Sequence, residues 1–353
     1  MAQAIPSSQY GLPEPAGIRE EPVMRRPTSA ALLLAAVLIG ASPSAIERTP
    51  PFSLGVVRAD GVLIPFTHFD GRRWKTHWPF PPSRVDVPLA LRDVPSKWWP
   101  ERTPELAWNV WTADGDARRV EVTAPFLTPV LCQGVVGLRT TYTPTGPVPP
   151  PLVQPYPKIG LATTGDVVVE PITVVPGDSG DWLRLEVQLA TEFTAAENEA
   201  LKSGWRDWWR QGPGRWTHPV PEAQRATAPI TLEAVYRAPY VEPGSMLYFF
   251  EATRRYEGRR TEDAPACDLV TFAWGWMKVG ASGEISLDLS ATITDCERWG
   301  INVMFPLGLL RADDRLLWVA QWSGWEEELY LVAEVPPDLD VKKLVETRAG
   351  DCW

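Results

Sequence analysis

Hydrophobic residues in this chain form short runs separated by polar turn residues, and two of these runs resemble each other. The segment LGVVRADGVLIPFTHFDG (54–71) aligns without a gap with LGLLRADDRLLWVAQWSG (307–324), at an offset of 253 residues. Both predict a strand, a tight turn and a second strand, and in the first segment Asp60-Gly61 supplies the residues that a two-residue hairpin needs. The identical pairs are Leu54/Leu307, Gly55/Gly308, Arg58/Arg311, Ala59/Ala312, Asp60/Asp313, Leu63/Leu316 and Gly71/Gly324.

Weaker copies of this unit recur between the two strong ones. They are NVWTADGD (109–116), VGLRTT (136–141), IGLATTGD (159–166) and VGASGE (279–284). Second turns at Asp70-Gly71 and Ser323-Gly324 lead into a third strand, so the unit is an antiparallel meander. The offset between the strong copies could hold several units of roughly 50 residues, near the length of a propeller blade. The pattern predicts an all-β fold of repeated antiparallel meanders, β-propeller-like, with stacked β-sandwiches as the alternative.

Two segments interrupt the meanders. Residues 144–157 contain seven prolines and predict an extended loop without sheet pairing. Residues 194–211 predict one short inserted helix, because Thr194 and Glu197 form a capping box and Gly212-Pro213 ends the pattern. We therefore expect residues 46–353 to form a single β-rich repeat domain.

The first 45 residues predict an N-terminal extension followed by a signal peptide. Met24-Arg25-Arg26 is a basic head, and the apolar run Ala30–Ala41 is too short to cross a bilayer. Small residues follow this run, so we expect cleavage before residue 46. The sequence thus predicts a periplasmic or secreted protein with no stable membrane span after processing.

Cysteine content and charge agree with export. All four cysteines lie beyond the predicted signal peptide, an even number that suits an oxidising compartment. A Cys267–Cys296 disulfide is favoured because the segment between them predicts a hairpin, and a Cys132–Cys352 disulfide follows by elimination; other pairings stay open. The net charge of −10 argues against a nucleic-acid partner. No cofactor is expected, and the scattered histidines predict no metal site.

The strongest catalytic motif is Gly177-Asp178-Ser179-Gly180, which matches the nucleophile segment of chymotrypsin-like proteases. His68 or His77, with Asp114 or Asp116, stands in the right chain order. However, Asp181 occupies the position where glycine would shape the oxyanion hole, and a carboxylate there would oppose a developing oxyanion. Gly, Asp and Ser clusters are also typical of turns. The sequence favours a turn between two strands.

Two further groups are candidates for a site. Glu326 and Glu328 could act as paired carboxylates in glycoside hydrolysis, although a charged edge or solvent face is the favoured interpretation. Tryptophan is abundant, with 18 residues, and side chains near turns can form platforms for sugars or proline-rich peptides. The candidate ligand-binding residues are Trp74, Trp78, Trp322 and Trp325, with core packing as the favoured alternative at each.

These patterns favour a function without catalysis. We expect an exported binding or scaffold protein of β-repeat architecture, with a protein or carbohydrate as a possible ligand. The alternative is an extracytoplasmic hydrolase acting on glycans or peptides.

Overall fold

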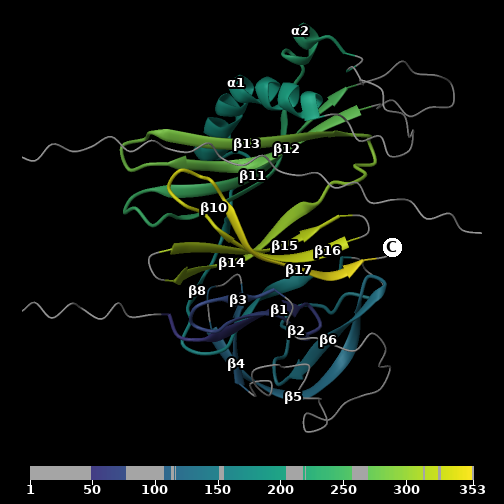
Figure 1. Cartoon of the computed structure of the whole chain (residues 1–353), viewed down its shortest axis with the longest axis vertical. Helices are drawn as coiled ribbons and strands as arrows, with labels where there is room; N and C mark the ends of the chain where they lie inside the picture. Colours follow the sequence, from purple (N-terminus) through teal and green to yellow (C-terminus); the bar gives the residue numbers. More distant parts are fainter. Residues whose placement is uncertain are drawn as a thin grey trace, which may run out of the picture. The chain divides into compact units, whose positions relative to one another are not determined.

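Three antiparallel sheets lie one above another, and a long helix covers the last of them (Figure 1). The computed structural model describes residues 49–76, 107–112, 115, 117–150, 155–203, 218, 220–256, 269–312, 315–324 and 327–351. We refer to the sheets as the barrel, the middle sheet and the outer sheet. The all-β class predicted from the hydrophobic pattern is confirmed.

The barrel closes six antiparallel strands in the order β1-β7-β4-β5-β6-β2, because β1 also pairs with β2. Hydrophobic side chains from all six strands fill its interior, among them Val57, Trp108 and Leu138. The strands are β1 (Phe52–Arg58), β2 (Leu63–Phe69), β4 (Ala107–Thr112), β5 (Ala117–Val130), β6 (Gln133–Thr140) and β7 (Lys158–Thr163), and β3 (Trp74–Lys75) extends β2.

The other two sheets have five strands each. The middle sheet contains, in spatial order, β17 (Lys342–Asp351), β16 (Glu327–Glu334), β15 (Arg315–Ser323), β14 (Val303–Ala312) and β8 (Val169–Glu170). The outer sheet contains β13 (Ile285–Thr294), β12 (Leu269–Val279), β11 (Met246–Tyr256), β10 (Thr231–Pro239) and β9 (Thr173–Val174). The hairpin predicted between Cys267 and Cys296 is confirmed in its described part as β12 and β13.

The two strong sequence repeats form equivalent hairpins, β1–β2 and β14–β15, each followed by an antiparallel third strand. Both hairpins have a β-bulge beside the shared Leu-Gly pair. The extra residue is Phe66 on the second strand of one copy and Leu307 on the first strand of the other. A Cβ on Gly308 would lie 2.4 Å from the Val169 side chain, so the close approach of β8 requires glycine there.

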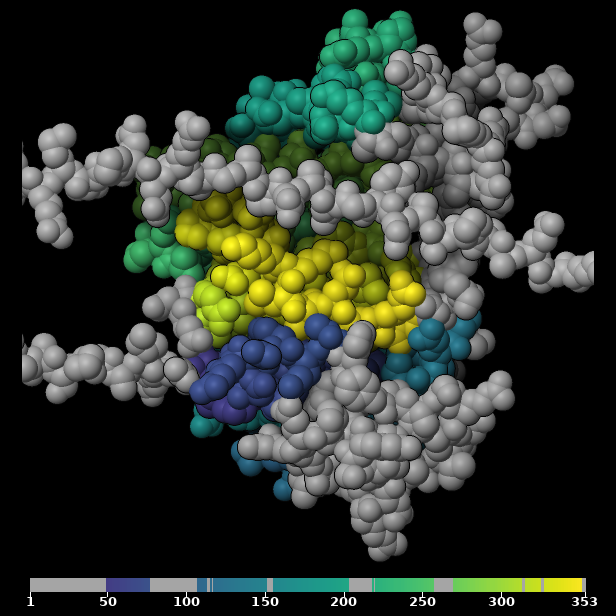
Figure 2. All heavy atoms as spheres, in the orientation of Figure 1, coloured from purple at the N-terminus to yellow at the C-terminus, as the bar shows by residue number. Residues whose placement is uncertain are grey.

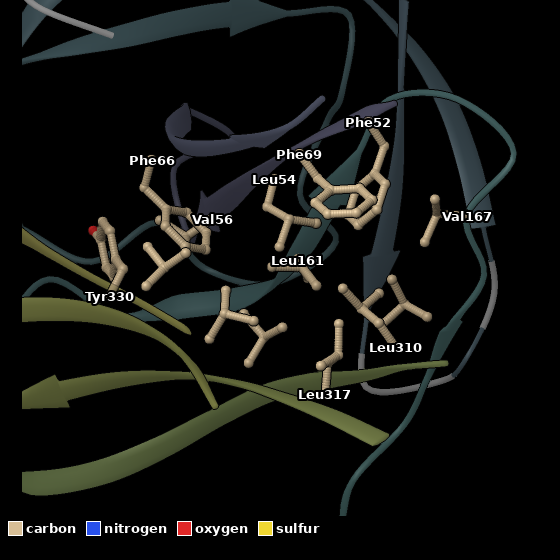
Figure 3. Packing of buried hydrophobic residues seen from close by; sticks show 14 of the residues in the cluster. Phe52, Leu54, Val56, Phe66, Phe69, Leu161, Val167, Leu310, Leu317 and Tyr330 are labelled. Atoms are coloured by element: carbon tan, nitrogen blue, oxygen red, sulfur yellow. The ribbon is translucent and has the colours of Figure 1, made fainter. Parts of the chain in front are cut away.

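The repeats do not form propeller blades. They belong to different sheets, and the outer face of the first hairpin packs against the second hairpin in one shared core (Figure 3). Leu54 and Phe66 from the barrel meet Leu317 and Tyr330 from the middle sheet in this core. The described strands contain no ring of four-stranded blades. The two repeated hairpins therefore pack against each other face to face. Their spacing in the sequence does not distinguish this arrangement from two neighbouring blades of a propeller.

The order of the layers places the C-terminal strands between the other two sheets. Figure 2 shows the yellow C-terminal strands between the blue strands of the barrel and the green strands of the outer sheet. The middle sheet packs on the outer sheet through a second core that includes Phe249, Trp276 and Trp318. The interior strands β15 and β16 are thus covered on both faces, which explains their nearly continuous buried runs, Leu316–Gln321 and Tyr330–Ala333.

Helix α1 (Gly180–Ser203) covers the free face of the outer sheet. Leu185, Leu189 and Phe193 recur every four residues on one face of α1, and all three are fully buried against that sheet. The helix begins at Gly180 rather than at the predicted Thr194, so Thr194 and Glu197 lie inside it. The predicted helix end at Gly212-Pro213 lies outside the described residues. In the proline-rich segment 144–157, the described residues form neither helix nor strand.

Glu197 continues the buried stripe of α1 and is fully buried. Its carboxylate accepts hydrogen bonds from Tyr256 (2.5 Å) and from Thr271, and it pairs with Arg225 (2.5 Å) and Arg254 (3.5 Å). Burial alone would raise the pKa of this carboxyl, but the donors from Thr271, Tyr256 and Arg225 outweigh burial and lower it. Arg225 ends the short helix α2 (Glu222–Arg225), so this network attaches α2 to the end of α1.

Candidate functional site: a tryptophan-lined groove

A groove opens where the middle sheet meets the outer sheet, and tryptophan side chains line it. An inner cavity of about 150 Å³ contacts Trp274, Trp276 and Trp322. An adjoining, more open cavity of about 460 Å³ contacts Trp322, the first half of β16 and most of β17. Trp322, Leu331 and Lys343 border both cavities, so the two form one continuous groove.

The strand register places the inner residues on one face. Trp274 and Trp276 alternate with Gly275 along β12, and successive side chains of a strand point to opposite faces of a sheet. On the neighbouring strand β13, Ser290 pairs with Trp274, and Asp288 pairs with Trp276. Directly paired residues of antiparallel strands share a face. All four side chains therefore point toward the middle sheet and line the inner cavity.

The tryptophans are held by aromatic packing beneath the groove. Trp274 and Trp322 meet edge to face, with ring centroids 6.4 Å apart and planes at 90°. Trp276 packs in the same way on Trp318, at 5.0 Å, and Trp318 is fully buried in the core between the sheets. Edge-to-face contacts fix ring orientation as well as contributing dispersion. The groove wall is therefore preformed rather than built from loops.

The outer cavity has charged residues that are paired with each other. Lys343 forms an ion pair with Glu346 (2.5 Å), and Arg348 lies 3.7 Å from Glu327. Asn302 donates a hydrogen bond to Glu327 (2.5 Å). The Lys343 ammonium lies 5.9 Å from the centroid of the Trp322 ring, which places a cation over that aromatic face.

Two carboxyl groups lie near the inner cavity. Asp288 forms no ion pair with any described residue, and partial burial together with the nearby Asp340 raises its pKa. Glu251 lies on β11, directly opposite Trp274 on β12, and is buried. Its carboxylate accepts a hydrogen bond of 2.6 Å from the backbone N–H of Met304. Burial raises the pKa of Glu251 to about 7. This hydrogen bond ties the outer sheet to the start of β14 in the middle sheet.

Of the predicted ligand-binding tryptophans, Trp322 lines the groove. Trp74 instead packs edge to face on Phe52 (5.5 Å) at the border of the core between barrel and middle sheet, a packing role. Trp78 and Trp325 lie outside the described residues. Trp274, Trp276 and Asp288 were not predicted. The Trp-Gly-Trp spacing of residues 274–276 was an available signal for two rings on one strand face.

Ser179 is the N-terminal cap of α1, not part of a turn between two strands. Its Oγ donates to the carbonyl of Pro176 (2.7 Å) and accepts the backbone N–H of Trp182 (3.2 Å). Its carbonyl accepts the N–H of Leu183 at 3.1 Å, which begins the helical pattern. The Gly-Asp-Ser-Gly motif therefore supplies capping chemistry, and Asp181 suits the positive end of the helix dipole. His68 lies in the barrel on β2, within 3.0 Å of Ser53.

We expect Ser179→Ala to lower the free energy of unfolding by about 1 kcal/mol, the usual cost of losing a helix cap. Ser179→Asp should restore most of that loss, because aspartate caps helices as well as serine does. Urea unfolding followed by circular dichroism measures both. Labelling of Ser179 by a fluorophosphonate, lost on replacing His68, would instead indicate a nucleophile.

Glu328 is not on a solvent face. It is fully buried on β16, an interior strand of the middle sheet. Its carboxylate pairs with Lys158 from the barrel at 2.7 Å and accepts a hydrogen bond from the Tyr330 hydroxyl at 2.5 Å. Burial lowers the pKa of Lys158 despite the neighbouring carboxylate. Glu328 thus joins two sheets, and Glu326 lies outside the described residues.

The predicted disulfides fall partly outside the described residues, because Cys267 and Cys352 are not described. Neither Cys132 nor Cys296 is a free thiol. Val270 pairs with Thr294 two residues before Cys296, and a Cβ on Gly350 would lie 2.1 Å from the Val130 carbonyl. The described neighbours of each predicted pair therefore lie together, and the pairing itself stays a prediction.

No family model matches the chain, and comparison with curated proteins and with solved structures finds no match. Among the described residues, no helix is long and apolar enough to span a bilayer. The same residues hold no cluster of side chains that could bind a metal ion. Fold and groove together define an all-β protein with a tryptophan-lined groove between two of its sheets.

Proposed function

We propose that this chain is an exported, non-catalytic binding protein and that the tryptophan-lined groove is its ligand site. The observation that carries the proposal is the groove itself, in which aromatic rings adjoin hydrogen-bonding groups in a preformed wall. Its more open cavity of about 460 Å³ has the size of typical small-molecule sites, which span about 300–1,000 Å³. Aromatic surface with a few placed polar groups is typical of ligand sites.

Pairing of the charged groups other than Asp288 supports binding over catalysis. Lys343 and Arg348 have carboxylate partners, and the Glu251 carboxyl is committed to the Met304 backbone. A general acid or base must reach the reacting atoms of its substrate. Glu251 is only 4% exposed, so a ligand in the groove cannot readily reach its carboxylate. Its role is to connect the outer sheet to the middle sheet.

Ligand retention tests this proposal. The purified protein is incubated with a glycan array and with a peptide array that includes proline-rich sequences. Binding to members of either array should be lost in Trp322→Ala and kept in Trp74→Phe, which alters a tryptophan outside the groove. The bound compound should be recovered unchanged by mass spectrometry. Retention unaffected by Trp322→Ala would contradict the groove assignment, and recovery of a cleaved compound would favour the hydrolase alternative.

Export and disulfide formation form a second prediction. We expect residues 24–45 to be removed and Cys267–Cys296 and Cys132–Cys352 to be bonded in the periplasmic or secreted protein. A Cys267–Cys296 bond closes a loop of about 30 residues and should stabilise the fold by roughly 3–4 kcal/mol in the chain-entropy model. Non-reducing peptide mapping of protein from the envelope fraction measures the mature N-terminus and both bonds. A retained LLLAAVLIG segment or free thiols would contradict the prediction.

A further inference from the structure

We infer that the groove binds an uncharged oligosaccharide of at least two sugar units, with Trp322 at the junction between two subsites. The inference rests on the proposed binding function and specifies its ligand. It follows from the shape of the groove, its charge and its hydrogen-bonding groups, taken in turn below.

The shape of the groove requires an elongated ligand. The inner and outer cavities share Trp322, Leu331 and Lys343 as lining residues. A ligand that fills both cavities therefore contacts the Trp322 side chain in each of them. The inner cavity, at about 150 Å³, is much smaller than the outer one, at about 460 Å³. A chain of linked rings fits this arrangement, with a terminal unit inside and the rest extending outward.

The charge of the groove opposes strongly charged ligands. Its described lining contains three carboxylates and two cations, Asp288, Glu327, Glu346, Lys343 and Arg348. Two carboxylates are already paired with the two cations, so a phosphate or uronate finds no unpaired positive partner and is repelled by Asp288. The whole chain carries a net charge of −10, which adds to this repulsion. A cationic ligand would in turn compete with Lys343 for the Trp322 face.

The polar groups offer both donors and acceptors along a hydrophobic wall. Asp288 and Ser290 border the inner cavity on the β13 side, facing the side of the groove formed by Trp322. Asn302 borders the outer cavity. A sugar ring presents hydroxyls at its edge, which can both donate and accept, and an apolar C–H face that can stack on an indole. A carboxylate such as Asp288 accepts hydroxyl donors through its two oxygens.

Isothermal titration tests the inference with named probes. The neutral probes are β-1,4-linked glucose, α-1,4-linked glucose and β-1,4-linked mannose oligosaccharides, each from one unit upward. The charged probes are oligogalacturonate and tetramethylammonium, and a proline-rich peptide is included. We expect at least one neutral series to bind, with affinity rising from one unit to two or three and then levelling off. The charged probes and the peptide should not bind.

Substitutions locate the binding. Trp322→Ala should weaken binding of the neutral oligosaccharide by roughly tenfold, which corresponds to about 1.4 kcal/mol and lies within the range of aromatic contacts. Trp322→Phe should keep part of the affinity. Asp288→Asn should also weaken binding, and it replaces an exposed side chain, so it tests the site even if Trp322→Ala does not fold. Trp74→Phe, outside the groove, should bind as the wild type does.

The possible failures are distinguishable. Absence of binding to every neutral series overturns the saccharide inference. If the peptide or tetramethylammonium binds instead and Trp322→Ala abolishes that binding, the groove remains the ligand site and the saccharide inference is wrong. If neutral oligosaccharides bind but neither Trp322→Ala nor Asp288→Asn weakens them, both the groove assignment and the inference fail.

Discussion

Replacing Glu197 with Gln should lower the free energy of unfolding by about 3–5 kcal/mol, the usual cost of removing one partner from a buried ion pair. Glutamine keeps the size of the side chain but removes the charge that compensates Arg225 and Arg254. Both guanidinium groups stay buried, with side chains 5% and 1% exposed. Urea unfolding followed by tryptophan fluorescence and circular dichroism measures the loss.

The matched control lies two residues along the same helix. Glu199 is 73% exposed and pairs with Lys202 on the surface, so Glu199→Gln should change stability by less than about 0.5 kcal/mol. Replacing Glu197 and Arg225 together by apolar residues of similar size should recover part of the loss. A Glu197→Gln variant within about 1 kcal/mol of the wild type would show that the network is not the joint described above.

Glu251→Gln should change how stability depends on pH. The pKa of Glu251 is raised from 4.5 to about 7 in the folded protein, so the unfolded chain loses this proton at lower pH than the folded chain. The stabilisation that comes from protonated Glu251 in the folded protein is therefore fully present below about pH 4.5 and is lost as the pH rises through about 7. As the pH rises from about 5 to about 8, the free energy of unfolding of the variant should therefore increase by about 2–3 kcal/mol relative to that of the wild type.

Urea unfolding at several pH values measures this difference, and other groups cancel because only Glu251 is changed. Glu242→Gln is the control, because the Glu242 side chain is 48% exposed and its carboxylate lies 3.8 Å from the Lys278 ammonium, a long ion pair. This control should follow the wild type at every pH. A Glu251→Gln variant that runs parallel to the wild type across the range would show that Glu251 does not hold its proton in the folded state.

The hairpins were predictable because their signals are local. An Asp-Gly turn favours positive φ wherever it stands, and Gly61 and Gly115 do adopt it, at 82° and 81°. The assembly of hairpins into sheets was not predictable, because β1 pairs with β7 across roughly a hundred residues of chain. Nothing in the pattern of either strand specifies the other. The barrel therefore has no signature in the sequence, whereas its individual strands do.

The helix start was missed because capping and turn chemistry use the same residues. Ser179 and its neighbours are compatible with a helix N-cap and with a turn between strands. Only the recurrence of Leu185, Leu189 and Phe193 every four residues indicates that a helix follows. In the groove, Trp322 was predicted from its place beside a turn. Asp288 comes from the neighbouring strand, and its position opposite Trp276 depends on the β12–β13 register, which sequence alone leaves open.

The layer that is central in space is the last one in this sequence. The Thr347 hydroxyl donates a hydrogen bond to the carbonyl of Phe66, a residue 281 positions earlier. The barrel and the outer sheet emerge first during synthesis, each with an apolar face that only the later strands β14–β17 cover. Contacts this distant in the chain form slowly, because a long loop must close before they contribute. Until strands β14–β17 have been made, the two apolar faces must therefore be kept from associating with each other or with other chains.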